Sequence, residues 1–241
     1  MHVHFLIHES FEAPGACESW ARNQGHHVTC SRVYEGEALP SSVENIDFLI
    51  VMGGPQDPAT TPEECPHFDA KAEQALIAAA IHARKAVIGI CLGSQLIGEA
   101  LKAPFAHSPE KEIGKFPVSL TEAGRQHPLF THFGHSLEVG HWHNDMPGLT
   151  PDATLIAYSE GCPRQIVAYS DLVYGFQCHL ELTAEVVERL IAHSEKDLSR
   201  AAEFRFVQTP AELRAHDYRE MNQALFTFLD KLAEHYCQSR Q

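Results

Sequence analysis

Short apolar runs alternate with longer amphipathic segments through the first half of the chain, and this alternation limits the folds that the chain can adopt. Residues 3–7, 48–52 and 86–90 have the length and composition of buried strands. Between the last two, residues 69–84 form an Ala-rich helical pattern. Strands alternating with helices are typical of βαβ units, so we predict a doubly wound α/β domain with a mostly parallel central sheet.

The pattern changes after about residue 102. Short segments separated by Gly, Pro and Asp turns favour antiparallel strands at residues 115–120, 154–158, 165–169 and 173–179. From Thr183 the pattern is helical to about residue 199, and a connection containing Pro210 leads to a terminal helix at residues 218–236. Because no Gly/Ser/Pro-rich linker divides the chain, we expect one domain, residues 1–190, with a helical C-terminal extension, residues 191–241, packed on it.

Charge and cysteine content exclude several classes of protein. The 241 residues include 18 Lys and Arg against 32 Asp and Glu, a formal net charge of −14 at pH 7, and no basic run interrupts this balance. Such a chain repels phosphate backbones and anionic lipid, so we expect neither nucleic acid nor a membrane as a partner. The 7 cysteines include no CxxC pair, which argues against a disulfide framework and a thiolate zinc site.

The sequence also predicts a cytoplasmic location. Unpaired thiols suit a reducing compartment. The first residues, MHVHFLIHES, contain no basic leader, and no apolar run approaches the roughly 20 residues of a membrane span.

The segment VIGICLGSQ, residues 87–95, carries the strongest chemical signal. A buried strand runs directly into Gly89-x-Cys91-x-Gly93, and a helical pattern begins at once. Glycines on both sides allow the tight turn of a nucleophile elbow, which exposes the side chain at its apex. The N-terminus of the following helix favours a thiolate, and the amide after the nucleophile can donate to an oxyanion. We therefore predict that Cys91 is a nucleophile rather than a packing residue.

A second segment, YGFQCHLE at residues 174–181, supplies the groups that a cysteine nucleophile needs. Alternate residues of a strand share a face, so His179 and Glu181 are expected to project to the same side. His179 can then accept the thiol proton while Glu181 orients the imidazole, as in a Cys-His-acid triad. Cys178 is expected to point into the core.

A third segment, FLIVMGGP at residues 48–55, ends a buried strand in Gly-Gly-Pro. The carboxyl edge of a parallel sheet is where ligands bind in open α/β folds. The amide of Gly53 or Gly54 could complete an oxyanion hole with that of Leu92, but on the sequence alone an ordinary turn is favoured.

Taken together, Gly-Gly-Pro, Gly-Ile-Cys-Leu-Gly-Ser-Gln and Gln-Cys-His-Leu-Glu resemble, in this order and spacing, the motifs of the class I (triad) glutamine amidotransferases. Other stretches resemble the stand-alone, GMP-synthase-like branch: Gly36-Glu-Ala-Leu-Pro40, Glu112-Ile-Gly, His127-Pro-Leu-Phe130, Trp142-His-Asn-Asp145 and Ser159-Glu-Gly-Cys-Pro-Arg-Gln165. The resemblance covers about residues 1–185. It implies the flavodoxin-like fold of that family, with antiparallel strands added to the parallel sheet.

The resemblance also implies a role for each matching residue. Cys91 would attack the side-chain amide of glutamine, forming a γ-glutamyl thioester and releasing ammonia, while His179 would carry the proton and Glu181 would orient it. The amides of Gly54 and Leu92 would hold the oxyanion. Substrate binding would involve Gly53, Gln95, His143, Asn144 and Asp145. At Asn144 the sequence departs from the GMP-synthase-like pattern, which commonly has glycine there.

Three functions stay open at this stage. Because the chain contains neither GxxxxGK[ST] nor GxGxxG, we find no means of activating an acceptor, and the ammonia would pass to a separate synthase subunit or go unused. The same thioester would form from other γ-glutamyl compounds, which makes a γ-glutamyl peptidase or hydrolase the alternative. A non-catalytic ligand-binding or redox-sensing protein is an alternative of another class, but it has no need of His179 and Glu181 together.

Seventeen histidines raise the question of a metal site, since four of them precede Asp145: His132, His135, His141 and His143. Zinc sites need convergent ligands at fixed spacing, and HExxH is absent. We expect solvated loop histidines here, with His143 in a substrate loop, and predict no metal and no cofactor.

Overall fold

Five parallel strands form the centre of the computed structural model, which describes residues 1–240. In spatial order they are β2 (His27–Arg32), β1 (His2–Ile7), β3 (Phe48–Val51), β4 (Ala86–Ile90) and β9 (Val173–Phe176). Every residue of β3, β4 and β9 is buried, because helices cover both faces of this part of the sheet. The predicted parallel centre is therefore confirmed.

The sheet continues beyond β9 through antiparallel strands and reaches ten strands within residues 1–240. These are β8 (Ile166–Ala168), β7 (Thr154–Tyr158) and β5 (Ala106–Leu120), with β6 (Ser136–Met146) antiparallel and β10 (Phe206–Val207) parallel to β5. The predicted mixture of a parallel centre and antiparallel additions in one α/β domain is confirmed.

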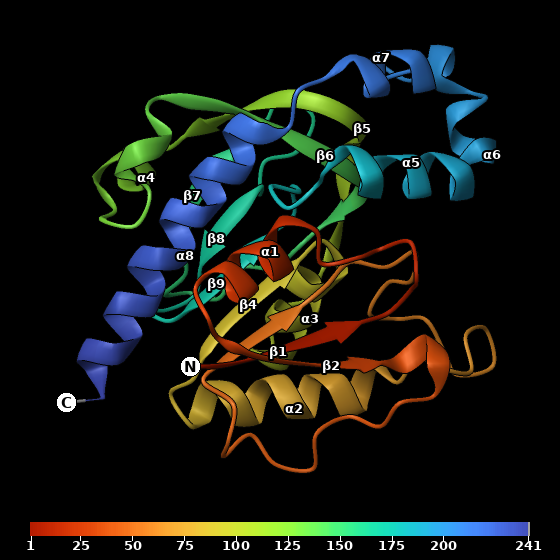
Figure 1. Ribbon diagram of the computed structural model, residues 1–241. Helices are drawn as coiled ribbons and strands as arrows, with labels where there is room; N and C mark the ends of the chain where they lie inside the picture. The colour runs from red at the N-terminus through yellow and green to blue at the C-terminus, as the bar shows by residue number, and fades with distance from the viewer. Residues whose placement is uncertain (241) are drawn as a thin grey trace.

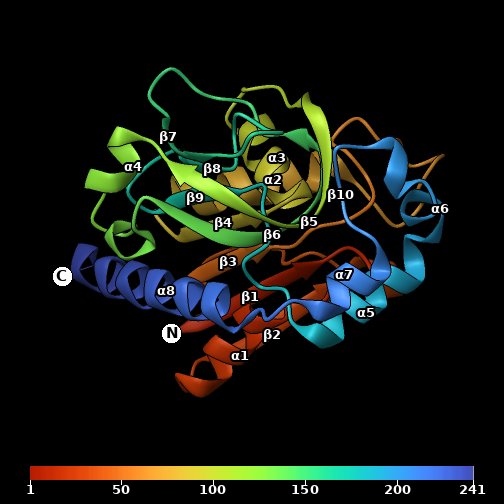
Figure 2. The same cartoon turned by 90° about the horizontal axis from the view of Figure 1, so that it is seen from above.

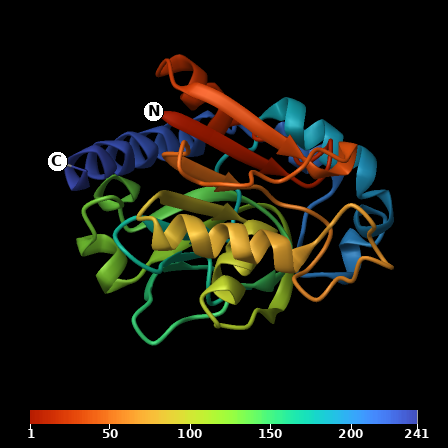
Figure 3. The ribbon, with the colours of Figure 1, turned by 90° about the horizontal axis from the view of Figure 1, so that it is seen from below.

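Two pairs of helices enclose the central strands. Figures 1 and 2 show α1 (Ala16–Asn23) and α8 (Arg219–Ser239) on one face, while α2 (Ala70–His82) and α3 (Leu92–Ala100) cover the other, where Figure 3 shows α2 lying across the sheet. The predicted apolar stripe of α8 is buried in the first of these layers: Met221, Leu225, Phe228 and Leu232.

Short helical segments complete the chain. They are η1 (Val33–Glu35), α4 (Glu122–Gln126), η2 (Thr131–Phe133), α5 (Ala184–His193), α6 (Glu195–Leu198), η3 (Ala201–Glu203) and α7 (Pro210–Ala215). The helix predicted from Thr183 to residue 199 is interrupted at Ser194, whose hydroxyl accepts a hydrogen bond from Nε1 of Trp142 at 3.0 Å. The break between α5 and α6 therefore lies against β6.

Three local predictions were wrong. The segment around Trp142, expected as a loop, is the strand β6, because β5 pairs with it along most of its length. The strand predicted to reach His179 ends at Phe176 and continues as bends. The connection before the terminal helix contains β10 and also α7, which Thr209 and Glu212 begin with a capping box.

The C-terminal helix is tied to the first elements of the chain. Nε1 of Trp20 donates to Asp230 at 2.7 Å, and the Tyr236 hydroxyl donates to Asp47 at 3.0 Å. The division into residues 1–190 and an extension stays a proposal, and Gln241 lies outside the described residues. Within residues 1–240, we find no helix that combines the length and the apolar character needed to cross a membrane.

Candidate active site

Cys91 sits at the turn between β4 and α3 with a backbone conformation that few non-glycine residues adopt, at φ 51° and ψ −110°. The glycines on either side make this turn sterically feasible. A Cβ on Gly89 would lie 2.2 Å from the carbonyl oxygen of Gly93, and a Cβ on Gly93 would lie 2.1 Å from that of Val51. The Gly-x-Cys-x-Gly pattern therefore folds as the predicted elbow.

Two groups approach the Sγ atom of Cys91. Nε2 of Gln177 donates to it at 3.4 Å, and the carbonyl oxygen of Trp142 lies 3.8 Å away. The Gln177 amide is oriented by Gln95, whose Nε2 donates to its Oε1 at 3.2 Å. Gln177, which the sequence did not single out, is thus a direct neighbour of the predicted nucleophile.

The sheet brings His179 to the same place. β4 and β9 are parallel neighbours, and the backbone N–H of Cys91 donates to the carbonyl of Phe176 at 2.7 Å. Three residues later, His179 pairs with Gly140 of β6 through two backbone hydrogen bonds, of 2.7 and 3.2 Å. The bends after β9 therefore place the histidine between β4 and β6.

His179 and Glu181 form a buried ion pair. Nδ1 of His179 lies 2.7 Å from Oε1 of Glu181, and the two residues are 0% and 2% exposed. Burial alone would lower the pKa of His179, but the negative charge of Glu181, its hydrogen bond to the imidazole and the nearby Cys91 side chain outweigh burial and hold that pKa well above its usual value. Among residues 1–240, Nε2 of His179 has no hydrogen bond partner. Hydrogen bonds between catalytic groups often form or tighten only when substrate is bound.

Four of the five residues predicted to bind substrate line one open pocket together with Cys91 and with Gly54 of the predicted oxyanion hole: Gln95, His143, Asn144 and Asp145. Gly53 and Leu92 do not line it but flank the nucleophile. A Cβ on Gly53 would lie 3.4 Å from Cβ of Cys91, and Leu92 begins α3. His179 and Glu181 are buried outside the pocket lining.

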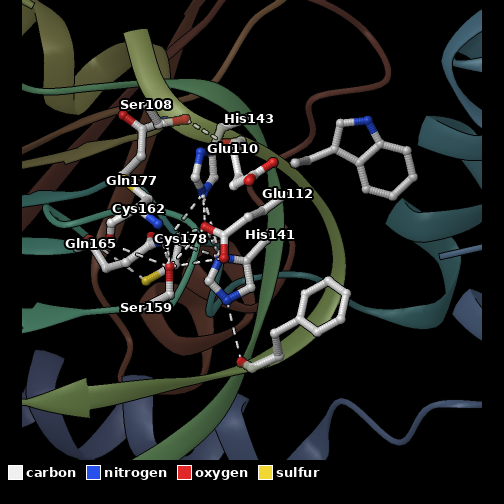
Figure 4. Close-up of polar contacts among 12 residues, drawn as sticks. Ser108, Glu110, Glu112, His141, His143, Ser159, Cys162, Gln165, Gln177 and Cys178 are labelled. Carbon is white, nitrogen blue, oxygen red and sulfur yellow. Dashed lines mark hydrogen bonds and ion pairs between the residues drawn. The ribbon is translucent and has the colours of Figure 1, made fainter. Parts of the chain in front are cut away.

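His141, predicted as a solvated loop residue, and His143, predicted in a substrate loop, lie instead on a strand, although His143 does line the pocket. Both are buried on β6, where they surround the carboxylate of Glu112 from β5, as Figure 4 shows. Oε2 of Glu112 lies 3.3 Å from Nε2 of His143 and accepts from Nε2 of Gln165 at 2.6 Å, while the Ser159 hydroxyl donates to both carboxylate oxygens. Of the other two histidines, His132 is half-buried and His135 is exposed.

Electrostatics keep this cluster in one charge state. Burial opposes ionisation of Glu112, but the hydrogen bond to His143 and the nearby histidines lower its pKa. Burial lowers the pKa of His141 to about 3 and also lowers that of His143. The cluster is therefore an anionic carboxylate held by neutral donors.

Two groups of side chains within residues 1–240 have the composition and closeness of metal ligands: Glu9, Cys65 and His67, and Glu112, His141 and His143. In the second, Nε2 of Gln165 lies 2.6 Å from Glu112 and 3.2 Å from a ring nitrogen of each histidine. Hydrogen bonds from Gln165 and Ser159 thus satisfy the carboxylate without an ion.

Three of the other cysteines are buried in the core of the domain. All seven are free thiols. Burial raises the pKa of Cys162 to about 12 and those of Cys17 and Cys178 well above the usual range. Cys178 is fully buried, as predicted.

Sequence reasoning missed Glu12, which lines the pocket although it is only 9% exposed. It follows β1 at the carboxyl edge of the sheet, and that placement is the one signal that could have identified it. Lys111 and Asp197 also line the pocket and form an ion pair at 2.6 Å. Their spacing in the sequence, across several elements, gives no hint of this contact.

The fold, the elbow cysteine and the histidine–glutamate pair define a class of protein. The family model of glutamine amidotransferase class-I matches residues 19–194. The chain belongs to the class I glutamine amidotransferase family, as its motifs predicted.

Individual relatives agree with this placement. The chain is 60% identical over 232 residues to the glutamine amidotransferase-like protein YfeJ of Salmonella typhimurium, which covers 96% of this chain and 97% of that protein. The solved structure of SMU.1228c superimposes with a TM-score of 0.95 at 48% identity, covering 97% of this chain and all of that one. A segment of 99 residues is 34% identical to the glutamine-hydrolysing GMP synthase of Caldanaerobacter subterraneus, covering 40% of this chain but only 19% of that protein.

Proposed function

We propose that this protein hydrolyses the side-chain amide of glutamine through a γ-glutamyl thioester on Cys91. The observation that carries the proposal is the convergence of the elbow cysteine and the buried His179–Glu181 pair, which is 2.7 Å apart, through neighbouring strands β4 and β9. A ligand-binding or redox-sensing protein would gain nothing from a buried base and its orienting carboxylate.

In the proposed reaction, the Cys91 thiolate attacks the amide carbon of the substrate. His179, whose protonated form Glu181 favours by raising its pKa, gives its proton to the departing nitrogen, and ammonia leaves. Water then attacks the thioester while His179 takes its proton as general base, the C–S bond breaks, and glutamate leaves with the Cys91 thiolate and the protonated His179 restored. Glu181 keeps the imidazole in the tautomer with the Nδ1 proton and stabilises its charge.

The oxyanion would be held by the backbone amides of Gly54 and Leu92. As the first residue of α3, Leu92 has an N–H that no carbonyl of its helix accepts. Gly54 lines the pocket, and among residues 1–240 its N–H donates to no acceptor. These two donors would stabilise the tetrahedral intermediate more than the ground state.

Glutamine itself would be placed by the rest of the pocket. Oε1 of Gln95 is buried and has no partner among residues 1–240, so it can accept from a substrate N–H. His143, Asn144 and Asp145 would face the α-amino and α-carboxylate groups, with Gly53 supporting the nucleophile from behind. We propose a cytoplasmic enzyme with no cofactor, whose ammonia could pass to a separate synthase subunit.

The test is release of ammonia and glutamate from glutamine by the purified protein. Cys91→Ala should lower the rate by roughly 10⁴-fold or more, whereas Cys237→Ala, which removes an exposed thiol, should leave it unchanged. Equal activity of Cys91→Ala and the wild type would refute the proposal.

A γ-glutamyl peptidase or hydrolase would use the same thioester and therefore needs a separate comparison. Turnover of free glutamine and of γ-glutamyl dipeptides should be measured side by side at equal concentrations. We expect glutamine to have the higher kcat/KM, and a clear preference for the dipeptides would favour the alternative.

A further inference from the structure

Glu12 differs from the other acidic residues of the pocket because its carboxylate is unpaired. Asp145 lies 2.5 Å from Nδ1 of His107, and Asp197 pairs with Lys111. Glu12 is 9% exposed, and among residues 1–240 its one hydrogen bond is made by its backbone N–H to Glu9. Because this carboxylate has no donor among the described residues and opens to the pocket, it is available to a donor that enters there.

The position of Glu12 can be fixed relative to the nucleophile. A Cβ on Gly53 would lie 2.8 Å from Oε2 of Glu12 and 3.4 Å from Cβ of Cys91. The carboxylate and the cysteine therefore flank the same glycine, and both line the pocket.

Glu12 is also within electrostatic reach of the histidine. Burial raises the pKa of Glu12, while the positive charge of His179 acts in the opposite direction and the charge of Glu181 adds to the increase. Glu12 therefore lies close enough to His179 and Glu181 for their charges to act on its carboxylate.

In the proposed hydrolysis, the substrate atom that lies between the nucleophile and the histidine is the departing nitrogen. It is bonded to the carbon that Cys91 attacks and receives its proton from His179. We propose that Glu12 accepts a hydrogen bond from this nitrogen and thereby determines specificity, favouring γ-glutamyl amides whose leaving group is ammonia or an amine over those whose leaving group carries a carboxylate.

The chemistry of this step balances without a further reactant. As the tetrahedral intermediate collapses, the C–N bond breaks, the C–S bond of the thioester remains, and the proton from His179 completes the leaving amine. Glu12 accepts an N–H hydrogen bond and takes no proton. A carboxylate on the leaving group would face the Glu12 carboxylate in the same buried space and be repelled.

This inference rests on the proposed function, and a substrate series separates the two. The substrates are glutamine, γ-glutamylglycine, its neutral glycinamide analogue and the cationic γ-glutamyl-ethylenediamine. For the wild type we expect kcat/KM for the cationic substrate to exceed that for γ-glutamylglycine by about tenfold or more. In Glu12→Gln, which keeps the size of the side chain, the kcat/KM values for these two substrates should differ by less than about threefold.

Glu18→Gln is the control, because Glu18 loses the same charge six residues away but pairs with Arg22 at 2.6 Å outside the pocket lining. It should keep the wild-type ratio. If Glu12→Gln does not fold, Glu12→Asp retracts the carboxylate by one methylene, and we expect it to reduce the ratio by about threefold or more.

An unchanged ratio in a folded Glu12 variant, or a wild type without the preference, would overturn the assignment of Glu12 while glutamine hydrolysis stands. If the wild type turns over none of the four substrates, the proposed function fails and the inference fails with it.

Discussion

Nδ1 of His179 lies 2.7 Å from Oε1 of Glu181, and this pair is buried beside the cysteine at the elbow between β4 and α3. The carboxylate holds the pKa of the imidazole well above its usual value against the opposing effect of burial. The pair therefore favours the protonated imidazole that a leaving nitrogen needs as its proton donor.

Glu181→Gln should lower kcat/KM by roughly 10² to 10⁴-fold and move the alkaline limit of activity to lower pH. The sign follows from the charge, because Glu181 favours the protonated imidazole and its loss lowers the pKa of His179. The measurement is the pH profile of glutamine hydrolysis. Glu185→Gln, an exposed carboxylate that pairs with Arg189 on α5, is the control and should keep the wild-type profile; an alkaline limit that stays in place in Glu181→Gln would contradict this account.

Gly89→Ala should abolish the elbow. Its Cβ would lie 2.2 Å from the backbone oxygen of Gly93, so a strand or helix must shift. We expect loss of glutamine hydrolysis and a destabilisation of more than about 3 kcal/mol in urea unfolding. Gly25→Ala is the control that separates packing from backbone strain, because Gly25 has φ 69° but no atom lies within 4 Å of its Cβ position. It should lower the free energy of unfolding by about 1 kcal/mol and leave glutamine hydrolysis unchanged. Equal effects of the two substitutions would count against the steric argument.

Glu112→Gln should destabilise the protein by about 1–3 kcal/mol because it leaves buried donors of Gln165 and Ser159 poorly paired. The pKa of Glu112 is lowered in the folded state. Its ionised form therefore contributes stability above the unfolded-state pKa of about 4.3, and this contribution is lost as pH falls through the folded-state pKa. The measurement is urea unfolding at neutral pH and near pH 3. The difference in the free energy of unfolding between the wild type and the variant should be smaller at the acidic pH.

The control for Glu112→Gln is Glu138→Gln on β6, whose carboxylate is 62% exposed and pairs with Lys115 at 3.4 Å. It should change the free energy of unfolding by less than about 1 kcal/mol. A larger effect at Glu138 than at Glu112, or a difference that grows in acid, would refute the role assigned to the buried carboxylate.

Phe228→Ala should show that the C-terminal helix belongs to the core of the domain. Phe228 is fully buried, and its ring centre lies 5.0 Å from that of Phe130 and 5.1 Å from that of Phe176. Its loss should lower the free energy of unfolding by about 3–5 kcal/mol in one cooperative transition. Phe226→Ala, on the partly buried side of α8, is the control and should lower the free energy of unfolding by less. A separate, earlier unfolding transition of the helix would show instead that α8 folds independently of the domain.

Much of the central fold and the key chemical groups could be predicted because they depend on local patterns. β3 and β4 are apolar runs of strand length, and the contact that requires a glycine at position 89 comes from Gly93, only four residues later. His179 and Glu181 were expected to share a face of a strand. They do meet, but through bends anchored to Gly140, a contact that no local pattern encodes.

The strand β6 could not be predicted for a specific physical reason. His141 and His143 give it the polarity of a loop, and they are buried only because Glu112, Gln165 and Ser159, from distant parts of the chain, surround them. The same reasoning applies to Glu12, whose burial arises when β1 and β3 come together at one edge of the sheet. By contrast, the capping box at Thr209 was visible in the sequence and would have predicted α7.

The most direct test of the central claim is to trap the covalent intermediate. The protein is mixed with glutamine, quenched in acid during turnover and digested, and the peptides are searched by mass spectrometry for a glutamyl group. The account predicts a hydroxylamine-labile glutamyl adduct on Cys91 that accumulates during turnover and is missing from Cys91→Ala. Sustained glutamine hydrolysis with the adduct on another residue, or undiminished hydrolysis by Cys91→Ala, would contradict it.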